Sequence, residues 1–119
     1  MENEVDKLLK ELSDIDGVRK VAVINNVEKK IARGINMDES STVLVRTLSD
    51  VVRSNMKYSR LTARKNEIED VLITYFDEIH LLKPLSRTAK YFIYISISRG
   101  ANIALTRIKL NERLTMYLK

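Results

Sequence analysis

The chain has 119 residues, the usual size of one domain, and 45% of them are hydrophobic. It has no Cys and a single His, His80, so disulfides, thiolate metal sites and cysteine nucleophiles are excluded. No apolar run approaches the ~20 residues needed to span a membrane, and the first residues are acidic, unlike a signal peptide. We therefore expect one soluble, cytoplasmic domain over residues 1–119 that is not an enzyme and holds no cofactor or metal.

The net charge of +5 is unevenly distributed along the chain. Residues 1–50 carry 8 basic and 10 acidic side chains, whereas residues 51–119 carry 13 and 6. Two stretches, 53–65 and 79–111, contain no acidic residue at all. Such an imbalance indicates the charge of a partner rather than its identity, and a solvated face explains it equally well.

Hydrophobic spacing divides the chain into eight elements. Helical segments place apolar residues three or four positions apart, as at Val5, Leu8 and Leu12, whereas strands alternate, as at Ile93 and Ile95. In chain order we expect a helix over 3–14, strands over 18–24 and 31–35, a helix over 39–60, strands over 67–76, 78–84 and 91–98, and a helix over 101–118. This order predicts an α/β (α+β) sandwich, in which a five-stranded, mainly antiparallel sheet carries helices on both faces.

The helix expected over 39–60 has two contrasting faces. Asp38 is a suitable N-cap for it. One arc of the helix holds its apolar residues, which are Leu44, Val45, Leu48, Val51, Val52 and Met56. Four basic residues, here called the basic stripe, fall within about 60° of one another on the far side: Arg46, Arg53, Lys57 and Arg60. The spacing therefore predicts a buried face opposed by a basic one.

The strand expected over 67–76 begins with acidic residues. Glu67, Glu69 and Asp70 could form a carboxylate site, but a solvated strand start or a protected sheet edge is the more ordinary reading. His80 alternates with apolar residues in the next strand, and no nucleophile or carboxylate pair at a recognisable spacing accompanies it. We expect His80 to be a half-buried or surface residue rather than a general base. Residues 25–28 are expected to form a turn, because Asn tolerates the left-handed conformation.

Several segments resemble the Roadblock/dynein light-chain family. They include residues 12–24, the long helix, Ile-His-Leu-Leu-Lys-Pro-Leu at 79–85, the strand at 91–97 and Ala-Asn-Ile-Ala-Leu-Thr-Arg at 101–107. The similarity spans about residues 4–114, and its motifs are structural rather than catalytic. The chain departs from the family at 25–28, where many relatives carry a hairpin that contains Asp and Gly.

This resemblance implies a Roadblock/profilin-like fold and a small, non-enzymatic dimer. Members of the family typically pair their third strands and set their second helices side by side as a platform for small Ras-like GTPases. Carried over to this chain, the dimer interface would include Glu69, Val71, Leu72, Ile73 and Tyr75. The platform helix would present Arg46, Asp50, Arg53, Lys57 and Arg60 to the partner. The second subunit could be another copy of this chain or a different Roadblock-type chain.

Two other functions stay open at the level of sequence. The excess of basic residues and the aromatic strands are compatible with a nucleic-acid-binding module or with another module for an acidic partner, although no helix-turn-helix, RNA-recognition or zinc-finger signature appears. The family resemblance also allows a light chain that links dynein to cargo. Insertion into a membrane is not expected, because the apolar face of the long helix is needed for the core.

Overall fold

The computed structural model describes residues 3–62, 68–86 and 89–117. Its elements are α1 (Glu4–Ser13), β1 (Val18–Asn25), β2 (Lys30–Ile35), α2 (Glu39–Leu61), β3 (Val71–Thr74), β4 (Glu78–Pro84), β5 (Tyr91–Ser98) and α3 (Ile103–Tyr117). The expected order of eight elements is confirmed. Most boundaries agree with the sequence expectations within two residues, and β3 is the exception.

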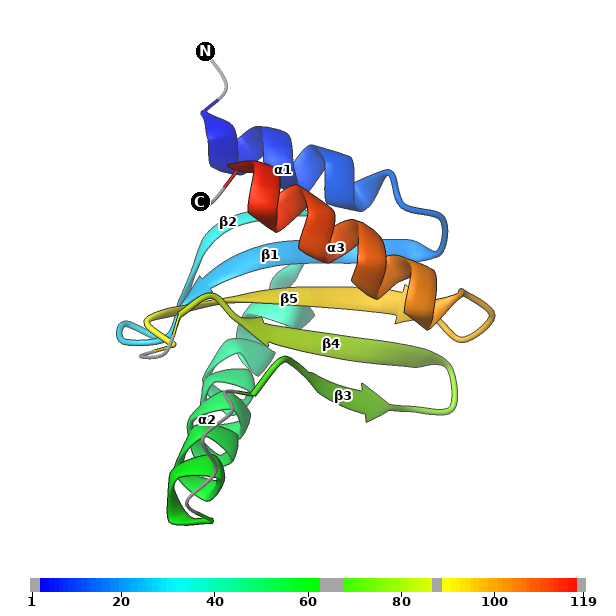
Figure 1. Cartoon of the computed structure of the whole chain (residues 1–119). Coiled ribbons are helices and arrows are strands. Elements are labelled where there is room, and N and C mark those ends of the chain that lie inside the picture. Colours follow the sequence, from blue (N-terminus) through cyan, green and yellow to red (C-terminus); the bar gives the residue numbers. More distant parts are fainter. Residues whose placement is uncertain (1–2, 63–67, 87–88, 118–119) are drawn as a thin grey trace.

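The strands form one sheet in the order β2-β1-β5-β4-β3. All four neighbouring pairs are antiparallel. Helices α1 and α3 cover one face of the sheet, and α2 crosses the other, which confirms the predicted sandwich (Figure 1). Strands β2 and β3 are therefore the two edges of the sheet.

Each face of the sheet has its own apolar core. On the first face, α1 and α3 pack over alternate side chains of the central strands, including Leu8, Val21, Ile95 and Leu110. On the second face, α2 packs over the intervening side chains of the same strands. That second core includes Ala22, Ile24, Val45, Leu48, Val52, Leu82, Phe92 and Tyr94. Strand β5 is buried on both faces, as suits a central strand with helices on each side.

Local interactions define where α2 and the first loop begin and end. The Ser41 amide donates to the Asp38 side chain at 2.9 Å, so the predicted N-cap is confirmed. That hydrogen bond, with those from the Ser40 and Ser41 hydroxyls, holds the pKa of Asp38 well below its usual range. Gly17 adopts a φ of 90°, and a Cβ there would lie 2.4 Å from the Cβ of Ala101. Glycine is therefore required at this turn.

The acidic start predicted for the strand over 67–76 is wrong in two respects. Strand β3 covers only Val71–Thr74, and residues 63–67 lie outside the described part of the chain. Glu69 is exposed, but the side chain of Asp70 is only 7% exposed and accepts from Arg107 Nε and Nη2 at 2.9 and 2.7 Å. Asp70 therefore ties the start of β3 to α3, a long-range contact that local charge patterning could not reveal.

The turn predicted over 25–28 is present within one residue, at 26–29. Its left-handed residue is Lys29, with a φ of 58°, and the Asn25 side chain at the end of β1 accepts from the amides of Val27 and Glu28. One further expectation is corrected by the structure. His80 is only 4% exposed rather than half-buried or at the surface, because the rings of two tyrosines cover it.

Candidate partner-binding surface

The basic stripe lies on one flank of α2, not opposite its buried face. Arg46, Arg53, Lys57 and Arg60 are all exposed. At 100° per residue, however, the centre of the stripe is roughly 115° from the centre of the buried residues Val45, Leu48 and Val52. The predicted opposition is therefore wrong, because the buried positions form a narrower arc and Leu44 is 42% exposed.

Arg53 is fixed against the loop that follows β1. Its Nη2 donates to the backbone oxygen of Asn26 at 2.7 Å. Asn26 is held in turn, because its amide donates to the Lys90 oxygen at 2.8 Å and its Nδ2 donates to the Ala89 oxygen at 2.9 Å. Only 4% of Asn26 is exposed. The guanidinium of Arg53 thus rests on a rigid acceptor that joins β1, β5 and α2.

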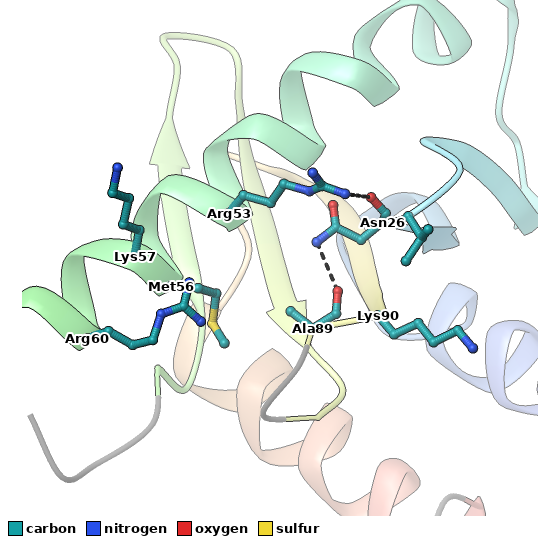
Figure 2. A pocket seen from close by; sticks show the side chains of 8 residues that line it. Asn26, Arg53, Met56, Lys57, Arg60, Ala89 and Lys90 are labelled. Atoms are coloured by element: carbon teal, nitrogen blue, oxygen red, sulfur yellow. Dashed lines mark hydrogen bonds between the residues drawn. The ribbon is translucent and has the colours of Figure 1, made fainter.

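A hollow of about 620 Å³ lies between α2 and this loop, and we refer to it as the α2 pocket. Figure 2 shows Arg53 reaching toward Asn26, Arg60 directed toward Met56, and the amines of Lys57 and Lys90 directed away from the hollow. None of the eight described lining residues is acidic. They are Asn26, Val27, Arg53, Met56, Lys57, Arg60, Ala89 and Lys90.

Only some of the residues predicted to contact the partner lie around this pocket. Arg53, Lys57 and Arg60 line it, whereas Arg46 lies about two turns nearer the start of α2. Asp50 is engaged by Lys29, whose Nζ lies 3.3 Å from its Oδ1. The sequence did not single out Asn26, Ala89 or Lys90 for the pocket. Two weak signals in the sequence could have pointed to them: Lys90 lies in a stretch without acidic residues, and Asn26 lies in a predicted turn.

The predicted dimer residues surround the free edge at β3. Val71, Leu72 and Ile73 are half-buried within the strand, whereas Glu69 and Tyr75 are exposed and lie outside it. The Tyr75 amide donates to the Glu78 oxygen at 2.8 Å. Antiparallel hydrogen bonding alternates, so Ile73 bonds to His80 in β4, and the backbone groups of Leu72 and Thr74 point away from the sheet.

Exposed apolar side chains occur on α2 and beside β3. Those on α2 are Val43, Leu44, Tyr58 and Leu61, and those that follow β3 are Tyr75 and Phe76. Val43 is 78% exposed, and Phe76 is exposed completely. Scattered apolar side chains are ordinary on a monomer, but a group beside an unpaired strand edge is typical of a protein–protein interface.

A buried polar cluster lies on the α2 side of β4 and β5. His80 Nε2 lies 2.5 Å from Glu78 Oε1 and 3.3 Å from the Tyr94 hydroxyl, and Ser96 donates to Glu78 at 3.1 Å. Burial would raise the pKa of Glu78, but hydrogen bonds from His80 and Ser96 outweigh it and lower that pKa. Burial, followed by the charge of Glu78, raises the pKa of Tyr94 to about 12.

Two kinds of feature were sought among the described residues: clusters of metal-binding side chains and membrane-crossing helices. No group of three or more His, Asp or Glu side chains among them could hold a metal ion. In the same ranges, no helix has the length and apolar character needed to cross a bilayer.

The arrangement of these elements is the Roadblock/LC7 fold, as comparison with solved structures shows. Among them, a Roadblock/LC7 domain from Streptomyces avermitilis superposes with a TM-score of 0.80 at 9% identity, covering 93% of this chain and 92% of that one.

Two proteins of Myxococcus xanthus have the same fold. MglB superposes with a TM-score of 0.81 at 9% identity and covers 93% of this chain and 89% of its own. MglC gives a TM-score of 0.66 at 12% identity and covers 97% of each chain. No family profile and no curated protein matches the sequence. At these identities the likeness establishes the fold, which the segments quoted above had predicted.

Proposed function

We propose that the chain is a non-enzymatic, cytoplasmic, dimeric regulator of a small Ras-like GTPase. The observation that carries this proposal is the combination of a Roadblock/LC7 fold with an unpaired β3 edge that is followed by the exposed apolar side chains of Tyr75 and Phe76. Similarity to MglB, which has also been solved in a tetrameric arrangement, supports both self-association and a regulatory role.

In the proposed dimer, two copies of β3 pair through the outward backbone groups of Leu72 and Thr74. Each new hydrogen bond replaces one to water, so the pairing itself contributes only about 1 kcal/mol per bond. Burial of apolar side chains such as Leu44 and Phe76 would supply the larger part of the association free energy. The basic stripe would then remain accessible on the outer flank of each α2.

The GTPase would bind across the paired α2 helices and contact the basic stripe with acidic side chains. A regulator changes its partner's activity only if it binds one nucleotide-dependent conformation better than the other. We therefore expect affinity for the GTPase to differ between its GDP and GTP states.

A binding assay with the host's small GTPases, loaded with either nucleotide, tests this proposal. Arg46→Glu/Lys57→Glu should weaken complex formation at least tenfold, since neither side chain makes a hydrogen bond or ion pair in the described chain. Lys7→Glu/Lys10→Glu, on the opposite face of the sheet, is the matched control. An equal loss of GTPase affinity in both variants, or an affinity that is the same for the GDP and GTP states, would contradict binding through the paired α2 helices.

A further inference from the structure

We infer that the α2 pocket is a binding site for a nucleotide-sized organic phosphate. This inference goes beyond the proposed function and does not depend on it. The pocket has the volume of a small-molecule site, because 620 Å³ falls within the range of roughly 300–1,000 Å³ that such sites occupy.

The first argument is the excess of positive charge. Arg53, Lys57, Arg60 and Lys90 line the hollow, and no carboxylate among the described residues lies within ion-pair distance of any of them. The nearest acid along this part of α2 is Asp50, which is engaged by Lys29. Four uncompensated cations around one hollow attract a polyanion more strongly than a single carboxylate, because each added negative charge interacts with all of them.

The second argument is that one guanidinium is already positioned. Arg53 uses one N–H on the Asn26 oxygen at 2.7 Å, and its other donors make no hydrogen bond in the described chain. Because Asn26 is itself tied to Ala89 and Lys90, the side chain of Arg53 is ordered before any ligand arrives. A guanidinium ordered in this way presents a planar fork that matches phosphate oxygens and loses little entropy on binding.

The third argument is the placement of the remaining groups. Arg60 lies two turns further along α2 and is directed toward Met56 and the hollow (Figure 2). It can contact the phosphate from the side opposite Arg53. Lys57 and Lys90 stand at the rim with their amines turned outward, and their long stems can rotate toward a bound anion. Val27, Met56 and Ala89 supply apolar surface for the organic part of the ligand.

The test is an isothermal titration of the full chain with ADP at about 0.15 M salt, with pyrophosphate and sulfate for comparison. We expect saturable binding of ADP that is tighter than that of pyrophosphate, and little binding of sulfate. Arg60→Gln should weaken ADP binding at least tenfold. Because the side chain of Arg60 makes no hydrogen bond in the described chain, this variant leaves the contact between Arg53 and Asn26 intact. Arg53→Lys should weaken it as well, since the charge stays but the fork is lost.

Lys10→Gln, on the exposed side of α1, removes the same charge from the opposite face of the sheet and should bind ADP as wild type does. Amide chemical shifts should change at Asn26, Val27 and Lys90. Absence of saturable ADP binding would overturn the inference. So would equal weakening in Lys10→Gln, or binding of single-stranded DNA alone, which would favour a nucleic-acid surface. No GTPase is present, so failure here leaves the proposed function untouched, and failure of the GTPase assay leaves this site untouched.

Discussion

The two faces of the sheet differ in the number of helices that cover them. Helices α1 and α3 together pack over one face, whereas the single helix α2 packs over the other, and both α2 and α3 carry exposed apolar side chains. The first face holds the domain together. The second carries the basic stripe, the α2 pocket and the polar cluster, and it adjoins the free edge at β3. We therefore expect function on the face that a single helix covers.

Truncation of one leucine on each face should give the largest difference in the free energy of unfolding. Leu8 on α1 is fully buried, so Leu8→Ala should reduce the free energy of unfolding by about 2–5 kcal/mol through lost burial and a cavity. Leu44→Ala on α2 removes a partly exposed side chain and should cost the monomer less than about 1 kcal/mol. Urea denaturation at low protein concentration measures both values. Similar losses would contradict the difference between the faces.

The ion pair that joins β3 to α3 should be the next most sensitive feature. Asp70→Asn removes a carboxylate that accepts two hydrogen bonds from Arg107, and we expect a loss of about 1–3 kcal/mol. Asp50→Asn is the control, because Asp50 pairs with Lys29 at the exposed surface, where such pairs contribute about 0–1 kcal/mol. Denaturation midpoints of the two variants give the comparison, and equal values would refute the structural role of Asp70.

The polar cluster on the α2 side should make part of the stability depend on pH. The pKa of Glu78 is lower in the folded chain than its ordinary value of 4.5. Its contribution is therefore complete above that value and is lost as the pH falls below it. Glu78→Gln should flatten the fall of the urea midpoint between about pH 6 and pH 3. Glu112 is exposed on α3, and Glu112→Gln should leave the pH dependence of the urea midpoint unchanged. An unchanged pH dependence in Glu78→Gln would contradict the role given to Glu78. Some pH dependence persists in Glu78→Gln because the pKa of Asp38 is also lowered in the folded chain.

The sequence predicted the fold better than the site, and the reason is the range of the interactions. Periodicity identifies α2 and β5 because their apolar positions repeat locally. The α2 pocket instead depends on Asn26, Arg53 and Lys90 meeting across the fold, and no local pattern encodes that meeting. Asp70 was misread for the same reason, because its partner Arg107 lies on the last helix.

The prediction for β3 shows which features of a strand the sequence alone can reveal and which it cannot. The β-rich composition located the strand, but only the register with β4 shows that Leu72 and Thr74 direct their backbone groups outward. A proline at Ile73 would therefore remove a bond to β4 and destabilise the monomer. A proline at Thr74 removes an outward N–H and leaves the bonds to β4 in place.

The most direct test of the proposed dimer is the mass of the wild-type chain and of Thr74→Pro by light scattering over a concentration series. We predict a wild-type mass of twice 13.8 kDa that resists moderate salt, and a Thr74→Pro variant that is folded by circular dichroism but shifted toward the monomer. A wild-type chain that stays monomeric at every concentration, or a variant that dimerises as strongly as wild type, would contradict pairing through the β3 edge.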